Sequence, residues 1–149
     1  MENTMTNDEV MKELIKLLKT NNMQRETNDT FEICTYIDSL QQKLAEMKEE
    51  LSNVQSQLME MQNNTFANKL KAQLTKSVTR ISSAYMTIKT DLFVVRESIK
   101  SKAGEIVSEF KKKGKAALNR VYEIFNVKEK LVAMREHVKE SQEEVAHSL

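Results

Sequence analysis

The chain has 149 residues, no proline, no tryptophan, two glycines and one cysteine, and its formal net charge is +1. Lys, Glu, Gln, Leu, Met and Ala dominate, and almost nothing would interrupt a helix, so we predict an all-α fold. Only 5% of residues are aromatic, which argues against a thick globular core and favours elongated helical packing without an active-site cleft. The single cysteine excludes a disulfide within the chain and indicates a reducing, cytoplasmic setting.

The near-neutral charge conceals three segments of different sign. Residues 1–65 hold 6 Lys/Arg and 12 Asp/Glu, a net charge of −6. Residues 66–120 hold 13 and 4, a net charge of +9, and residues 121–149 hold 4 and 6, a net charge of −2. The acidic and basic segments either attract each other within one helical bundle, or the basic segment attracts an outside polyanion.

The amino-terminal segment, residues 1–28, is predicted to form a short helix and a turn. It has neither the basic region nor the apolar run of a signal peptide, and no stretch of the chain is long and apolar enough to span a membrane. Thr6 and Glu9 have the spacing of a capping box at the start of this helix, and the polar residues Thr20–Asn22 would end it. Asp29 would then begin the next helix.

The most specific pattern in the chain is an unbroken alternation of four- and three-residue steps between apolar residues. This alternation is typical of coiled-coil heptads, in which one narrow apolar seam faces another helix. The pattern starts at Ile33, breaks at Asn63–Thr65 and then resumes. The predicted seam residues are Ile33, Ile37, Leu40, Leu44, Met47, Leu51, Val54, Leu58, Val78, Ile81, Tyr85, Ile88, Leu92 and Val95.

We predict that residues 29–100 form an antiparallel coiled-coil hairpin with arms at about 29–62 and 66–100. If the chain folds back at Asn64, the two apolar seams come into register, and Leu58 faces Leu70. Beside the seam, Lys43 and Lys48 would face each other across a parallel dimer, and the other flanking positions include Gln41, Gln55 and Gln57. This is poor encoding for a parallel dimer, because partner choice there rests on opposite charges.

Residues 101–149 are predicted to form a basic helix followed by a final amphipathic helix, and a helical bundle is the alternative to an elongated arrangement. The basic helix would run through Gly114 to Phe125, and the last helix would start near Asn126. The polar tail, SQEEVAHSL, is predicted to fray.

Five cations stand out in the basic helix: Lys111, Lys112, Lys113, Lys115 and Arg120. Such a cluster suits the phosphates of nucleic acid or the surface of an anionic membrane. It is equally typical of a solvated helix face that pairs with the acidic segment, and the sequence leaves these alternatives open.

The sequence lacks the residue patterns of metal sites, nucleophilic centres and phosphate-binding loops. His137 and His147 are ten residues apart, and Cys34 has no histidine near it in the sequence. We therefore predict no metal site, no cofactor and no enzymatic activity.

Most of the chain lies in two segments, NDEVMKELIKLLKTNNMQRETNDTFEICTYIDSLQQKLAEMKEEL and IKSKAGEIVSEFKKKGKAALNRVYEIFNVKEKLVAMREHVKES. They resemble an uncharacterised all-helical family, a domain of unknown function, from gut clostridia and their mobile elements. The resemblance implies a bacterial cytoplasmic protein, an amino-terminal piece of a longer parent, and no activity that transfers to particular residues. Small helical proteins of phages and plasmids often inhibit host defence nucleases, and the resemblance suggests the same role for this chain.

We predict a non-enzymatic helical interaction or assembly module. It would self-associate as a homo-oligomer, or bind a protein partner, through the heptad seam. One alternative is a nucleic-acid-binding protein that uses the five cations of the basic helix. Another is an anti-CRISPR-like, mobile-element inhibitor that binds a host defence nuclease through the acidic surface of residues 1–65.

Overall fold

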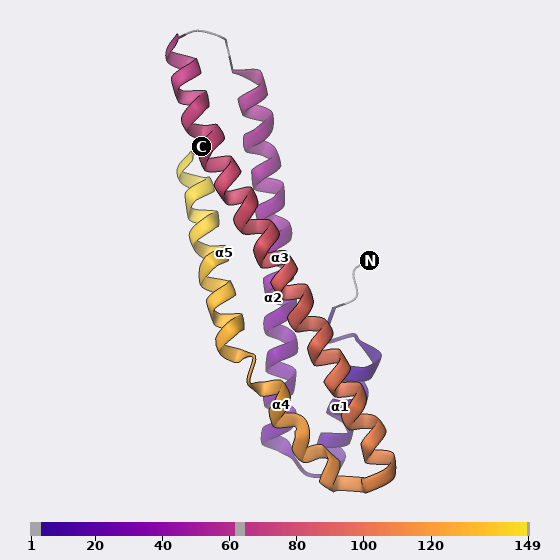
Figure 1. Ribbon diagram of the computed structural model, residues 1–149. Coiled ribbons are helices and arrows are strands. Elements are labelled where there is room, and N and C mark those ends of the chain that lie inside the picture. Colours follow the sequence, from indigo (N-terminus) through magenta and orange to yellow (C-terminus); the bar gives the residue numbers. More distant parts are fainter. Residues whose placement is uncertain (1–3, 62–64, 149) are drawn as a thin grey trace. The chain divides into compact units, whose positions relative to one another are not determined.

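The computed structural model describes residues 4–61 and 65–148, and over these residues the fold is all-α, as predicted. No helix within the described residues is long and apolar enough to cross a membrane. In chain order the elements are α1 (Glu9–Thr20), α2 (Gln24–Glu60), α3 (Thr65–Lys113), the 3₁₀ helix η1 (Gly114–Val121), α4 (Tyr122–Phe125) and α5 (Lys128–Ser148) (Figure 1).

The cap of α1 differs from the predicted capping box. Asp8, not Thr6, is the N-cap, and its carboxylate accepts hydrogen bonds from the backbone N–H groups of Val10 (3.1 Å) and Met11 (3.2 Å). Thr6 instead donates its backbone N–H (3.1 Å) and its hydroxyl (2.9 Å) to the carboxylate of Asp38 on α2. The prediction is wrong because a partner distant in the sequence takes the hydroxyl that the capping box requires.

The chain turns from α1 into α2 within three residues. The backbone N–H of Asn21 (3.1 Å) and its side-chain amide (2.7 Å) both donate to the carbonyl of Leu17. Asn22 has a φ of 61°, a left-handed conformation that asparagine tolerates. The predicted end of the first helix is confirmed. The predicted restart at Asp29 is wrong, because the turn at Asn22 lets α2 begin at Gln24.

The predicted break at Asn63–Thr65 lies outside the described residues except for Thr65, the first residue of α3. α3 then continues to Lys113 and stops at Gly114, whose φ is +69°. A right-handed α-helix cannot continue through this conformation. The prediction of one helix through Gly114 to Phe125 is therefore wrong, and the tighter helix η1 follows instead.

α5 includes the tail that the sequence predicts to fray. Ser141 is 7% exposed and Val145 is 1% exposed, and they continue the helical spacing of the buried residues Met134 and Val138. Because this buried face persists, the helix extends to Ser148.

The chain forms two compact units, and α2, α3 and α5 each contribute segments to both. Unit 1 comprises the described residues up to Ser39 together with Leu92–Val132, and unit 2 comprises the described residues of Leu40–Asp91 and those from Ala133 on. The core of unit 1 includes Met11, Leu14, Leu18, Ile33, Ile37, Ile99, Ile106, Leu118, Val121 and Ile124. The core of unit 2 includes Leu44, Met47, Leu51, Ile81, Ile88, Met134 and Val138.

Candidate interaction surface

The predicted seam residues lie inside the two units rather than on their surfaces. Tyr85 is half-buried, and each of the others is 8% exposed or less. This burial occurs within a single chain, so the seam offers no open apolar surface to a partner. The residue pairing of the coiled-coil hairpin stays a prediction, and Leu70, the predicted neighbour of Leu58, is 40% exposed.

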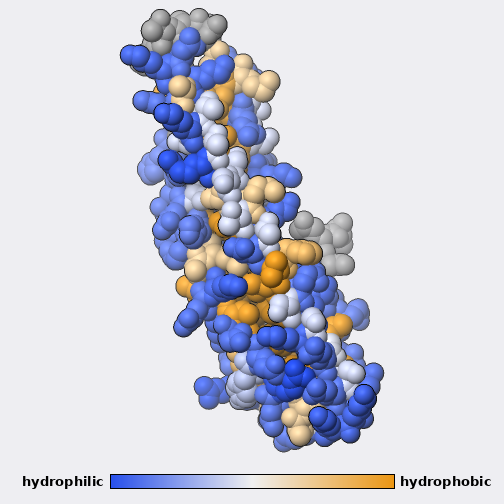
Figure 2. All heavy atoms as spheres, viewed as in Figure 1, coloured by the Kyte–Doolittle hydropathy of each residue, from blue (hydrophilic) through white to orange (hydrophobic). Residues whose placement is uncertain are grey.

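Several large apolar side chains of unit 1 are nevertheless exposed. They are Phe31, Phe93, Val94, Tyr122 and Val132, each at least 50% exposed. Figure 2 shows, on the face that it draws, hydrophobic surface gathered in a patch among mainly hydrophilic side chains. Scattered apolar residues are ordinary on protein surfaces, so an exposed apolar residue beside a hollow is the more informative feature.

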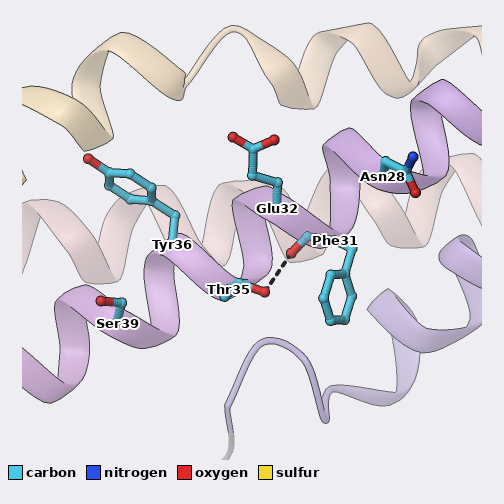
Figure 3. A pocket seen from close by; sticks show the side chains of 6 residues that line it. All are labelled: Asn28, Phe31, Glu32, Thr35, Tyr36 and Ser39. Atoms are coloured by element: carbon cyan, nitrogen blue, oxygen red, sulfur yellow. Dashed lines mark hydrogen bonds between the residues drawn. The ribbon is translucent and has the colours of Figure 1, made fainter.

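Such a hollow, of about 490 Å³, lies along the first half of α2. Its lining side chains follow helical spacing, which places them on neighbouring ridges of one helix. Phe31 is 53% exposed, and the Thr35 hydroxyl donates to its carbonyl at 3.0 Å (Figure 3). The lining residues are Asn28, Phe31, Glu32, Thr35, Tyr36 and Ser39.

A second hollow, of about 70 Å³, continues this surface to the first turn of α5. It shares Glu32 and Tyr36 with the larger hollow and adds Lys128, Leu131 and Val132. Figure 3 shows Glu32 and Tyr36 projecting from the side of α2 opposite to the ring of Phe31. We call the two hollows together the Phe31 surface. It combines the exposed side chains of Phe31 and Val132 with polar and charged groups, which are more numerous among its lining residues.

The helix that carries the Phe31 surface is acidic. Residues 24–39 contain one cation, Arg25, and four carboxylates, a net charge of −3. Three of these carboxylates have partners, because Glu26 accepts from Tyr122 and Asp29 lies 3.8 Å from Lys128, while Asp38 binds the segment before α1. Within the part of the chain that the structure describes, Glu32 is exposed and has no ion pair. It is therefore the carboxylate available to a cation.

Aromatic and charged side chains of α4 and α5 form a cluster in unit 1, and one of them contacts the first turn of α2. Tyr122 and Phe125 stack edge to face, with ring centroids 5.5 Å apart, and Lys128 Nζ lies 5.8 Å from the Phe125 centroid. The Tyr122 hydroxyl donates to Glu26 at 2.8 Å. This hydrogen bond lowers the pKa of Glu26 and raises the pKa of Tyr122.

The five predicted polyanion-binding cations are not equivalent in the structure. Arg120 lies 2.6 Å from Glu109, 2.7 Å from Glu123 and 3.1 Å from Glu105. These carboxylates raise the pKa of Arg120, and Arg120 lowers the pKa of Glu123. Arg120 therefore serves a structural role inside unit 1.

The other four cations, Lys111, Lys112, Lys113 and Lys115, are exposed at the end of α3 and the start of η1. Within the described residues none of them forms an ion pair. The structure thus separates four open lysines from one arginine that is surrounded by carboxylates.

Sequence reasoning did not identify the Phe31 surface. Its members lie beside the seam on α2, and Leu131 and Val132 come from a segment almost 100 residues later. A signal was present, because Phe31 is a large apolar residue outside the heptad seam. The contribution of α5 follows from the tertiary fold and leaves no local mark in the sequence.

A family model described as "Family of unknown function (DUF6674)" matches residues 7–149. No curated protein and no solved structure matches the chain.

Proposed function

The chain belongs to the family of unknown function DUF6674, and from this premise we propose that it is a non-enzymatic helical interaction module that binds a protein partner. The observation that supports the proposal most strongly is the Phe31 surface, where an aromatic side chain is 53% exposed over a hollow of about 490 Å³. Aromatic side chains in hollows are the usual anchors of protein interfaces.

The chemistry of the surface suits an amphipathic, basic helix of the partner. The lining runs from Asn28 to Ser39, roughly three helical turns, which matches the footprint of a helix laid in a groove. Apolar side chains of the partner would cover Phe31 and Val132, and a lysine or arginine would pair with Glu32.

The charge of α2 argues against a second copy of the chain using the same surface. Two segments with a net charge of −3 each would face one another, and like charges across an interface are unfavourable. The homo-oligomer that the sequence predicts would therefore have to use another surface. A host nuclease with a basic face, met in the cytoplasm as the sequence suggests, is a partner of the proposed chemistry.

The proposal can be tested with two designed peptides of about four helical turns. They would share one leucine-based apolar face, and their polar faces would carry lysine in one peptide and glutamate in the other. Nuclear magnetic resonance titration of the whole chain would report which residues respond. We expect the lysine peptide to shift the signals of Phe31 and Tyr36 and the glutamate peptide to leave them unchanged.

Two phenylalanines of unit 1 provide a matched pair of variants. Phe31→Ala should weaken binding of the lysine peptide, whereas Phe93→Ala, which removes a ring 62% exposed on α3, should not. Glu32→Gln should weaken it as well, because the unpaired carboxylate is lost. Equal responses to both peptides, or equal losses in the two phenylalanine variants, would count against the proposal.

A further inference from the structure

We infer that Lys111, Lys112, Lys113 and Lys115, hereafter the lysine cluster, form a second binding surface that takes the phosphate backbone of nucleic acid. This inference does not depend on the proposed protein partner. All four side chains are exposed, and within the described residues none of them is in an ion pair. They lie within five consecutive residues, so their charges act on a ligand together.

The cluster carries more positive charge than its place in the fold requires. Lysines in the last turn of a helix complement the helix dipole, which is equivalent to roughly half a negative charge at the carboxyl end of α3. Four lysines exceed this severalfold. The nearby carboxylates Glu105, Glu109 and Glu123 surround Arg120, at 2.6 to 3.1 Å, so they are already engaged.

Nucleic acid fits the cluster better than an anionic membrane. An interfacial helix must present apolar side chains beside its cations in order to insert them among lipids. Here Ala117, Leu118 and Val121 are 3% exposed or less, in the core of unit 1, and Phe110 is half-buried. What remains at the surface is charge, and charge alone is sufficient to bind phosphates.

Counterion release determines how strongly the binding of the duplex should depend on salt concentration. With at most four phosphates neutralised, the slope of log K against log salt on duplex DNA should be about −3.6 or shallower. Affinity should then fall by at most about 150-fold between 50 and 200 mM salt, without dependence on base sequence.

The experiment is fluorescence anisotropy of the whole chain with a short fluorescein-labelled DNA duplex of mixed sequence, over a series of salt concentrations. A variant with all four cluster lysines changed to Gln should bind at least tenfold more weakly at the lowest salt, with a slope near zero. A control with the same change of net charge, Lys48→Gln, Lys69→Gln, Lys76→Gln and Lys139→Gln, neutralises exposed lysines of unit 2 and should lose less than threefold.

An arginine variant, circular dichroism and a competition with vesicles complete the experiment. Changing the four cluster lysines to Arg keeps the charge and should restore binding, and circular dichroism should show unchanged helix content in every variant. Failure of the wild-type chain to bind the duplex, or equal losses in the two glutamine variants, would overturn the inference. So would binding to phosphatidylserine vesicles that displaces the duplex and survives high salt, because that behaviour belongs to a membrane surface. Loss of duplex binding leaves peptide binding at the Phe31 surface unaffected, so the two proposals fail separately.

Discussion

Tyr122 and Glu26, 96 positions apart in the chain, are joined by a hydrogen bond in which the tyrosine hydroxyl donates to the carboxylate at 2.8 Å. It links α4 to the first turn of α2. The bond favours the charged carboxylate and the neutral phenol. It therefore makes the stability of unit 1 depend on pH at both ends of the scale.

We expect Tyr122→Phe to destabilise the protein at neutral pH and to have less effect in acid. The folded-state pKa of Glu26 is lowered, so its contribution is present above its unfolded pKa and is lost as pH falls through the folded pKa. The pKa of Tyr122 is raised, so its contribution is present below the unfolded pKa and is lost as pH rises through the folded one. Urea unfolding of both chains at neutral pH and near pH 3 would test this. Tyr85→Phe is the control. If the free energies of unfolding of wild type and Tyr122→Phe differ as much in acid as at neutral pH, this explanation is wrong.

Burial of the seam within one chain predicts a particular unfolding behaviour. Ile81→Ala should lower the free energy of unfolding by about 2–5 kcal/mol, because Ile81 is only 2% exposed. Met86→Ala, on the same helix at 55% exposure, should cost much less. In both variants the unfolding midpoint should not depend on protein concentration, because the single chain by itself already buries Ile81. A midpoint that rises with concentration would mean that the seam is completed between chains.

The two glycines should respond in opposite directions to alanine. Gly104 lies inside α3, and an added Cβ would meet Val10 Cγ1 at 4.0 Å, an ordinary contact; the substitution should stabilise by up to about 1 kcal/mol through helix propensity. Gly114 has a φ of +69° and nothing within 4 Å of an added Cβ, so Gly114→Ala should cost about 1–2 kcal/mol through the backbone alone. Thermal and urea unfolding would measure the stability of both variants. If both substitutions change the free energy of unfolding in the same direction, the prediction is wrong.

Cys34 should resist thiol reagents in the native protein. It is fully buried, and burial, with a further contribution from Asp38, raises its pKa to about 12, so almost no thiolate exists near neutral pH. We expect slow reaction with a chromogenic disulfide reagent in buffer and prompt reaction in urea. Rapid labelling of the native chain would show that the segment covering Cys34 opens readily.

The all-helical fold and the buried face of α2 were accessible from the sequence, because heptad spacing depends only on helical period and on the preference of apolar groups for burial. Ile37 and Met47, for example, are fully buried where the seam placed them. The cap of α1 was not accessible, since Asp38 competes for Thr6 from a distant helix. The Phe31 surface likewise depends on the approach of α5, which no local pattern encodes.

The prediction of a continuous helix through Gly114 to Phe125 is wrong for a different reason. The predicted helix through Gly114 would keep 3.6 residues per turn as far as Phe125. In the structure η1 has three residues per turn, and Ala117, Leu118 and Val121 within it are buried. The helical period therefore changes over the eight residues of η1, which begin at the glycine with positive φ.

That change of period also fixes the orientation of everything after it. With three residues per turn, Leu118 and Val121 of η1 lie on one line, and Tyr122, the next residue and the first of α4, is turned outward by about 120°. Inserting or deleting a single residue within η1 would rotate Tyr122 by about a third of a turn, away from Glu26, while the composition of the segment stayed almost the same. The hydrogen bond between Tyr122 and Glu26 therefore depends on the number of residues in η1 as well as on their identity.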